Sequence, residues 1–105
     1  MNEYLDHFIN YLAVERGLAR NTLDAYSRDL VRYLDYLDKQ AVPTFAEVSP
    51  ATVLRFLGHL NKSGLSARSR ARSLAALRTF HRFLAREKIT SSNPTDQVLS
   101  PKSLT

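Results

Sequence analysis

The chain has 105 residues, of which 44% are hydrophobic and 24% are charged. These values lie near those of soluble globular domains, so they exclude disorder throughout and favour one compact core. The absence of cysteine excludes a disulfide framework and a thiolate metal site. No apolar run approaches the roughly 18 residues of a membrane span, and residues 1–4 do not resemble a signal peptide. We therefore expect a cytoplasmic protein with no membrane partner.

The positive charge is concentrated in the second half of the chain. Residues 1–61 contain six Lys and Arg against eight Asp and Glu, a net charge of −2. Residues 62–105 contain nine against two, a net charge of +7. This asymmetry is typical of a protein that presents one basic surface to a polyanion, although a merely solvated basic face is the alternative.

Two amphipathic helices are predicted in the first part of the chain. Apolar residues recur at helical spacing over residues 2–16, and Gly17 then supplies a stop signal. A second helix is predicted over residues 20–39, ending before Val42-Pro43. The apolar stripes consist of Leu5, Phe8, Ile9 and Leu12 in the first helix, and of Leu23, Tyr26, Leu30, Tyr33, Leu34 and Leu37 in the second.

Two further helices are predicted after Pro43. Residues 44–47 have capping-box spacing and predict a short helical turn. Ser49-Pro50 has the pattern of an N-cap followed by proline at the first helical position, and predicts a helix over residues 50–61. A fourth helix is predicted over residues 66–88, which contain neither Gly nor Pro. We expect residues 1–89 to form the domain and residues 90–105 to form a tail and linker.

The predicted fold class follows from the periodicity of these segments. No segment alternates with period two over a useful length, so no strand is predicted. Four amphipathic helices with short connections predict an all-α fold, an orthogonal-type bundle of four main helices.

The fourth predicted helix has an apolar face and a basic face. On a helical wheel with about 100° per residue, its arginines and its large apolar residues fall on opposite sides. The arginine stripe consists of Arg68, Arg72, Arg82 and Arg86, with Arg78 at its edge and Ala71, Ala75 and Thr79 between them. The apolar face consists of Leu74, Leu77, Phe80 and Leu84.

This arrangement favours contact with a nucleic acid. Small residues allow a helix backbone to approach a duplex while arginines reach phosphates or guanine edges. Glu87 is the only acidic residue between Lys62 and Lys88, whereas a helix built for solubility mixes both signs. Arg70 falls beside the apolar face, either at a frayed helix start or in a buried ion pair.

A weaker basic row is predicted on the second helix, opposite its apolar stripe, and consists of Asn21, Ala25, Arg28, Arg32 and Lys39. Asp24, Asp29 and Asp35 flank this row and dilute its field, so a solvated face is the alternative there. The candidate DNA-binding residues are Asn21, Arg28 and Arg32 on the second helix, and Lys62, Ser66, Arg68, Arg72, Arg78, Thr79, Arg82 and Arg86 on or before the fourth.

The sequence contains no recognisable catalytic or cofactor-binding constellation. The histidines His7, His59 and His81 form no metal-type pair at helical spacing, which favours structural or surface roles. No GxGxxG, GKS/GKT or GxSxG motif occurs, and the five tyrosines lack nearby histidine and arginine partners for phosphoryl transfer. We expect no cofactor, no metal and no enzymatic activity in this chain alone.

Several motifs occur in a characteristic order between Asn2 and Lys102. They are YLAVERGLARNTLDAY at residues 11–26, Asp29-Leu30, Gly64-Leu65-Ser66, SLAALRTF at residues 73–80, Asn93-Pro94 and Ser100-Pro101-Lys102. In this order the chain resembles the N-terminal core-binding (SAM-like) domain of tyrosine recombinases and phage integrases. Within that family it is most similar to the Xer recombinases, which resolve chromosome dimers.

The resemblance implies a four-helix arm that clamps one side of a double-stranded recombination site through its second and fourth helices. It also implies that the catalytic residues belong to a further domain after residues 100–102, and that four protomers assemble on two sites. The alternatives are an unrelated helical DNA-binding domain and a protein-interaction bundle, either of them standing alone without recombinase activity.

Overall fold

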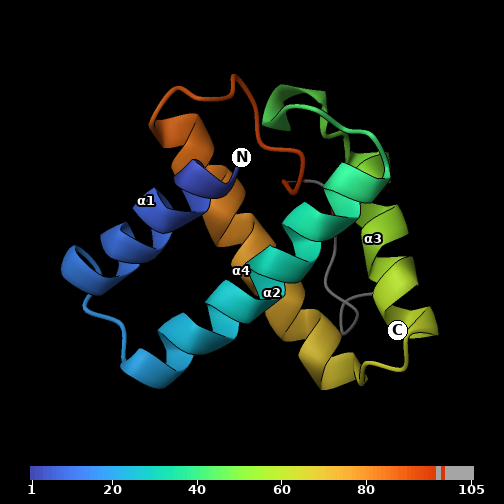
Figure 1. The fold of residues 1–105 in the computed structure, drawn as a ribbon, viewed down its shortest axis with the longest axis horizontal. Coiled ribbons are helices and arrows are strands. Elements are labelled where there is room, and N and C mark those ends of the chain that lie inside the picture. Colours follow the sequence, from blue (N-terminus) through green and yellow to red (C-terminus); the bar gives the residue numbers. More distant parts are fainter. Residues whose placement is uncertain (97, 99–105) are drawn as a thin grey trace. The chain divides into compact units, whose positions relative to one another are not determined.

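The computed structural model describes residues 1–96 and residue 98 (Figure 1). The described residues form the α-helices α1 (Asn2–Val14), α2 (Arg20–Lys39), α3 (Pro50–Lys62) and α4 (Ala67–Arg86), with a 3₁₀ turn η1 (Phe45–Glu47) and no strand. This confirms the predicted all-α class with four main helices. The chain divides into two compact units, residues 1–43 and 44–105. A domain boundary at residue 89 stays a prediction.

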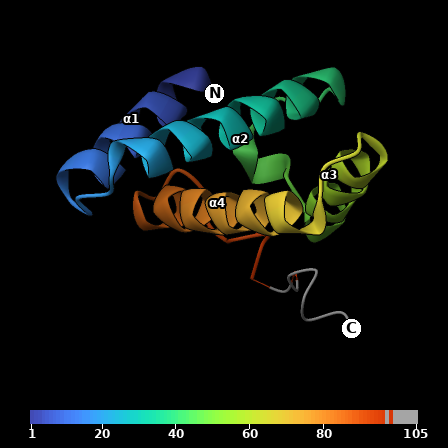
Figure 2. The same ribbon diagram turned by 90° about the horizontal axis from the view of Figure 1, so that it is seen from below.

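In the first unit, α1 and α2 lie side by side and are joined by a short turn (Figures 1 and 2). Most residues of the predicted apolar stripes are buried: Leu5, Phe8 and Leu12 of α1, and Leu30, Tyr33, Leu34 and Leu37 of α2. Helix α1 ends at Val14, two residues before the predicted end. Gly17 adopts a φ of +59°, and the Leu18 amide turns back to donate to the Leu12 carbonyl at 3.2 Å.

In the second unit, the start of α3 confirms the predicted N-cap. The Ser49 hydroxyl accepts from the Thr52 amide at 3.2 Å, and the Thr52 hydroxyl accepts from the Ser49 amide at 3.3 Å. Two of the amides left unpaired at a helix start are thereby satisfied. The capping-box spacing of residues 44–47 predicts the η1 turn correctly, but Thr44 forms no side-chain cap bond there.

The core of the second unit is centred on aromatic rings. Phe45 of η1 meets Phe80 of α4 edge to face, with ring centroids 5.2 Å apart and planes at 81°. This is a favourable arrangement of two ring quadrupoles. Phe56 and Leu60 of α3 are also fully buried.

Three helices end in the same backbone motif. The amides of Val42, Leu65 and Ile89 donate to the carbonyls of Leu37, Leu60 and Leu84, each five residues earlier, at 3.0, 3.2 and 2.9 Å. The residue before each donor has a positive φ: Ala41 (56°), Gly64 (90°) and Lys88 (61°). This is the Schellman ending, in which glycine is the preferred residue at the left-handed position. Only Gly64 follows that preference.

Candidate nucleic-acid interface

Helix α4 separates its side chains into a buried face and an exposed face. Leu74, Leu77, Phe80 and Leu84 are fully buried. All four residues of the arginine stripe are exposed: Arg68, Arg72, Arg82 and Arg86. Their exposure agrees with the helical wheel, whereas their contact with DNA stays a prediction.

Only small side chains lie between these arginines on the exposed face of α4. Ala71, Ala75 and Thr79 are half-buried. The Thr79 hydroxyl donates to the Ala75 carbonyl one turn earlier, at 3.0 Å. Its proton is therefore already in use, and Thr79 can offer an incoming group only an acceptor and a methyl group.

Two arginines of the stripe carry no compensating negative charge from the described residues. Nε of Arg86 lies 3.7 Å from the Glu87 carboxylate, with both side chains about half exposed, so that pair is weak in water. Arg68 and Arg82 form no ion pair within residues 1–96. Their guanidinium charges therefore face solvent and are available to an anion.

Two other arginines of α4 are turned toward the protein. Nη1 of Arg70 donates to the Leu65 carbonyl at 2.6 Å, so Arg70 neither frays nor relies on an ion pair. Nη2 of Arg78 donates to the Val98 carbonyl. Arg78 is half-buried, and this bond sets it apart from the exposed arginine stripe at whose edge the helical wheel places it.

The turn before α4 is exposed and polar. Ser66 is the N-cap of α4: its hydroxyl accepts from the Ser69 amide at 3.1 Å and donates to the Ser69 hydroxyl at 3.2 Å. Lys62 is the exposed last residue of α3. The positive end of the α4 dipole and the Lys62 charge thus flank one short turn, a combination that favours anions.

The candidate residues of α2 lie among acidic neighbours. Asn21 and Arg28 are exposed. Arg32 lies 3.6 Å from Asp29, and Lys39 lies 3.5 Å from Asp35. The dilution of this basic row, expected from the sequence, is therefore present as ion pairs.

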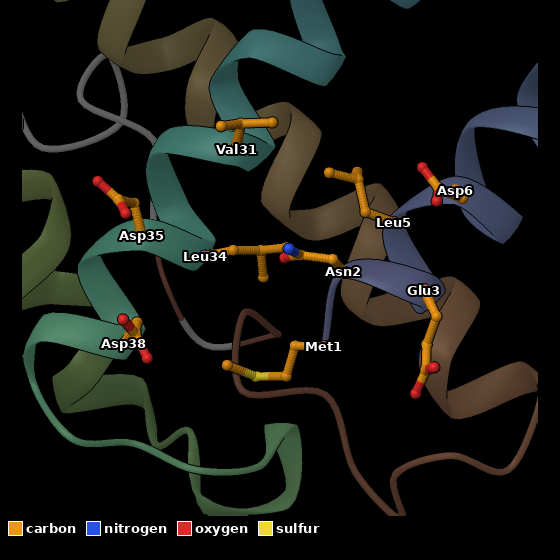
Figure 3. A pocket seen from close by; sticks show the side chains of 9 residues that line it. All are labelled: Met1, Asn2, Glu3, Leu5, Asp6, Val31, Leu34, Asp35 and Asp38. Atoms are coloured by element: carbon orange, nitrogen blue, oxygen red, sulfur yellow. The ribbon is translucent and has the colours of Figure 1, made fainter.

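A hollow in the first unit is unsuited to phosphate. It has a volume of about 800 Å³ and lies between the start of α1 and the middle of α2. Figure 3 shows Met1, Leu5 and Leu34 between the two helices, with carboxylates on both sides. These are Glu3 and Asp6 on α1, and Asp35 and Asp38 on α2. Like charge repels a polyanion from this groove.

His81 and Tyr33 are buried, and burial shifts the pKa of each side chain. His81 is fully buried beside Phe45 and Phe80, and burial lowers its pKa to about 4. Burial raises the pKa of Tyr33 far above its ordinary value. Within residues 1–96 and 98, no cluster of His, Asp and Glu could hold a metal ion, and none of the helices is long and apolar enough to span a bilayer.

Sequence reasoning missed the part played by main-chain carbonyls in holding arginines. The bonds of Arg70 to Leu65 and of Arg78 to Val98 join side chains to backbone atoms that have no sequence signature. Only the helical wheel gives an indication, because it places both arginines away from the centre of the arginine stripe.

Comparison with known proteins identifies the class of this domain. The chain belongs to the family described as phage integrase, N-terminal SAM-like domain, whose model matches residues 5–88. This confirms the resemblance that the motif order indicates.

Among curated proteins, the chain is similar to several that are named tyrosine recombinase XerD. The identity is 40% over 103 residues for Halalkalibacterium halodurans, 39% over 104 residues for Oceanobacillus iheyensis and 36% over 102 residues for Staphylococcus epidermidis. Each match covers 97% of this chain but only 34% or 35% of the relative. The chain thus spans about a third of the length of the curated relatives that it matches.

Proposed function

We propose that this chain is the sequence-specific DNA-binding arm of a site-specific tyrosine recombinase of the Xer or phage-integrase type. The arm clamps one side of a double-stranded recombination site during strand exchange, whether that serves integration or chromosome-dimer resolution. Family membership and the similarity to XerD proteins support the recombinase part of the proposal. The surface of α4 supports the DNA-binding part.

The observation that carries the proposal is the exposed arginine stripe of α4. Arg68 and Arg82 are exposed without an acidic partner among the described residues, and half-buried small residues separate the arginines. A duplex can approach the backbone of such a helix closely, because only small side chains lie between the arginines on this face. Each arginine that neutralises a phosphate also releases a counterion, which provides most of the affinity.

The arginines are expected to divide their roles along the helix. Arg86, in the last turn, holds phosphate and fixes register. Arg72 and Arg82 stand where a guanidinium can reach a base edge in the major groove. Lys62 and Ser66, at the turn before α4, hold a second phosphate beside the helix N-terminus.

The second helix contributes less in this proposal. Asn21 and Arg28 offer exposed polar groups, whereas the charge of Arg32 is shared with Asp29. We expect α2 to contact the sugar–phosphate backbone and to add affinity without sequence preference.

The arm is proposed to be non-catalytic and to work within a larger assembly. Its relatives are about three times as long, which supports our proposal that the catalytic groups of such a recombinase lie outside residues 1–105. In the complete protein, double-stranded DNA and other recombinase protomers in a tetrameric synaptic complex are the proposed partners. The proposed location is the cytoplasm, at the nucleoid.

A fluorescence-anisotropy titration tests this function. The probes are a labelled random-sequence duplex and a duplex selected for tight binding from a random pool by repeated rounds with the wild-type chain. Arg86→Ala should weaken both probes about equally. Arg72→Ala and Arg82→Ala should cost about 1–3 kcal/mol on the selected duplex and less on the random one.

Two outcomes contradict the proposal. If selection enriches no sequence and all three variants bind like the wild type, the arginine stripe is a solvated face. If the chain binds no duplex but captures another protein through α4, it is a protein-interaction module.

A further inference from the structure

Arg78 connects the middle of α4 to the end of the described chain. Its guanidinium donates through Nη2 to the main-chain carbonyl of Val98, twenty residues later. Val98 is 3% exposed, and Arg78 is half-buried. A hydrogen bond from a charged donor at a site largely shielded from water is stronger than one between neutral groups.

The segment between α4 and Val98 has its own network of hydrogen bonds. The Thr90 hydroxyl donates to the Ser92 carbonyl at 3.1 Å. The Asn93 side-chain oxygen accepts from the Thr95 amide at 2.9 Å and from the Thr95 hydroxyl at 2.6 Å. Pro94 and Thr95 are buried. Figure 2 shows this segment returning toward α4 after the helix ends.

Two backbone amides complete the turn and report on it. The Asp96 amide donates to the Asn93 carbonyl at 3.3 Å, and the Val98 amide donates to the Thr95 carbonyl at 3.1 Å. Both amides exchange with solvent only when this turn opens. The Arg78 bond ties this turn to α4, and the Val98 side chain is buried.

We propose that Arg78 is a positioning residue that fixes the place where the chain leaves this domain, at Val98, and that it is not a DNA contact. In a longer protein of the kind to which this chain is similar, the following chain would then start from a fixed point on α4. That helix also carries the arginine stripe, so one rigid element would set both the DNA contact and the exit of the chain. Residues 90–96 and residue 98 would therefore be part of the domain and not of a linker.

Hydrogen exchange of the 105-residue chain, followed amide by amide by NMR, tests the proposal without DNA. In Arg78→Met, which keeps the aliphatic stem, protection of the Asp96 and Val98 amides should fall about tenfold or more. The amides of Leu60 and Leu77, in the helical core, should change much less. Arg78→Lys keeps a charged donor and should restore part of the protection. Unchanged exchange at Asp96 and Val98 in Arg78→Met overturns the proposal.

Arg82→Met is the matched control, because it makes the same change on the exposed face of the same helix. It should leave exchange at Asp96 and Val98 unchanged and lower affinity for the selected duplex about tenfold. Arg78→Met should lower that affinity clearly less. If Arg78→Met loses as much affinity as Arg82→Met while exchange is unchanged, Arg78 is a DNA contact and the proposal is wrong. If neither variant affects DNA binding, the proposed function fails, while exchange still decides the role of Arg78.

A second variant covers the case in which Arg78→Met does not fold. Val98→Ala reduces the buried apolar side chain at the same joint and leaves Arg78 in place. It should release the Thr95 and Asp96 amides selectively, while Leu60 and Leu77 stay protected. Equal loss of protection across residues 44–96 would show that this segment is not held separately, and would overturn the proposal.

Discussion

The carboxylate of Asp29 lies 3.6 Å from Nη1 of Arg32, yet the two side chains differ sharply in exposure, at 1% for Asp29 and 43% for Arg32. A buried carboxylate depends on the groups that compensate its charge. Arg32→Ala removes one of them and should lower the free energy of unfolding by about 1–2 kcal/mol, a figure reduced for the exposure of Arg32. Urea denaturation measures this change. Arg28→Ala, on the same helix at an exposed position, is the control, and an equal loss in both variants would refute the dependence.

The left-handed end of α2 predicts a stabilising substitution. Ala41 has a φ of 56°. At this φ the Cβ of alanine comes too close to the following carbonyl oxygen, whereas glycine has no Cβ and is not strained. Ala41→Gly should therefore raise the free energy of unfolding by about 0.5–1 kcal/mol, despite the added flexibility of the unfolded chain. Ala13→Gly, inside α1, should instead lower it by about 1 kcal/mol. Thermal unfolding of the two variants should shift in opposite directions, and two downward shifts would contradict the account.

The buried His81 makes stability depend on pH in a defined direction. Its folded pKa of about 4 lies below the ordinary 6.5, so the unfolded chain binds the proton more readily between these values. The free energy of unfolding should therefore fall as the pH falls through this window, and the contribution of His81 between pH 7 and pH 5 is about 2 kcal/mol. Urea titrations at several pH values measure the slope.

His81→Leu isolates this contribution, because leucine does not titrate. Whatever its absolute stability, the variant should lose less stability than the wild type between pH 7 and pH 5. Equal slopes in the two proteins would show that His81 is not the group responsible.

The isolated chain should show no strand-cleaving activity. Nucleophilic attack by a tyrosine on phosphorus needs cationic or hydrogen-bonding groups that stabilise the developing charge. Tyr33 is fully buried, and burial raises its pKa, which disfavours the phenolate further. Incubation with a supercoiled plasmid, followed by denaturing gels, should reveal neither nicks nor a covalent protein–DNA adduct. An adduct linked through one of the five tyrosines would contradict this expectation.

The local features of the fold were predictable because they depend on neighbours in sequence. Helical periodicity places Arg68 and Arg82 opposite Leu77, and the Ser49-Pro50 pair indicates the start of α3. Gly64 marks the end of α3 because, of the three residues at the left-handed position of a Schellman ending, it alone is of the preferred type. Ala41 and Lys88 adopt the same conformation although neither residue type favours it. The ends of α2 and α4 can therefore be predicted only from a following proline or from composition.

The features that could not be predicted depend on contacts between distant positions. Arg78 lies at the edge of the stripe on the wheel, and its bond to Val98 follows from how the segment after α4 folds back. The burial of His81 depends on Phe45 of η1, which periodicity within α4 does not reveal. For the same reason, the sequence pattern does not reveal the burial of Thr90, Thr95 and Val98 in the segment after α4, where the boundary at residue 89 stays a prediction.

The central claim is that the exposed arginines of α4 hold DNA phosphates, and the salt dependence of duplex binding tests it most directly. The logarithm of the binding constant should fall with the logarithm of salt concentration at a slope of about −4 or steeper, because each phosphate contact releases counterions. Arg86→Ala should flatten this slope by about one unit, whereas Arg55→Ala, an exposed arginine of α3, should leave it unchanged. If Arg55→Ala flattens the slope as much as Arg86→Ala, total charge and not the face of α4 governs binding, and the claim is contradicted.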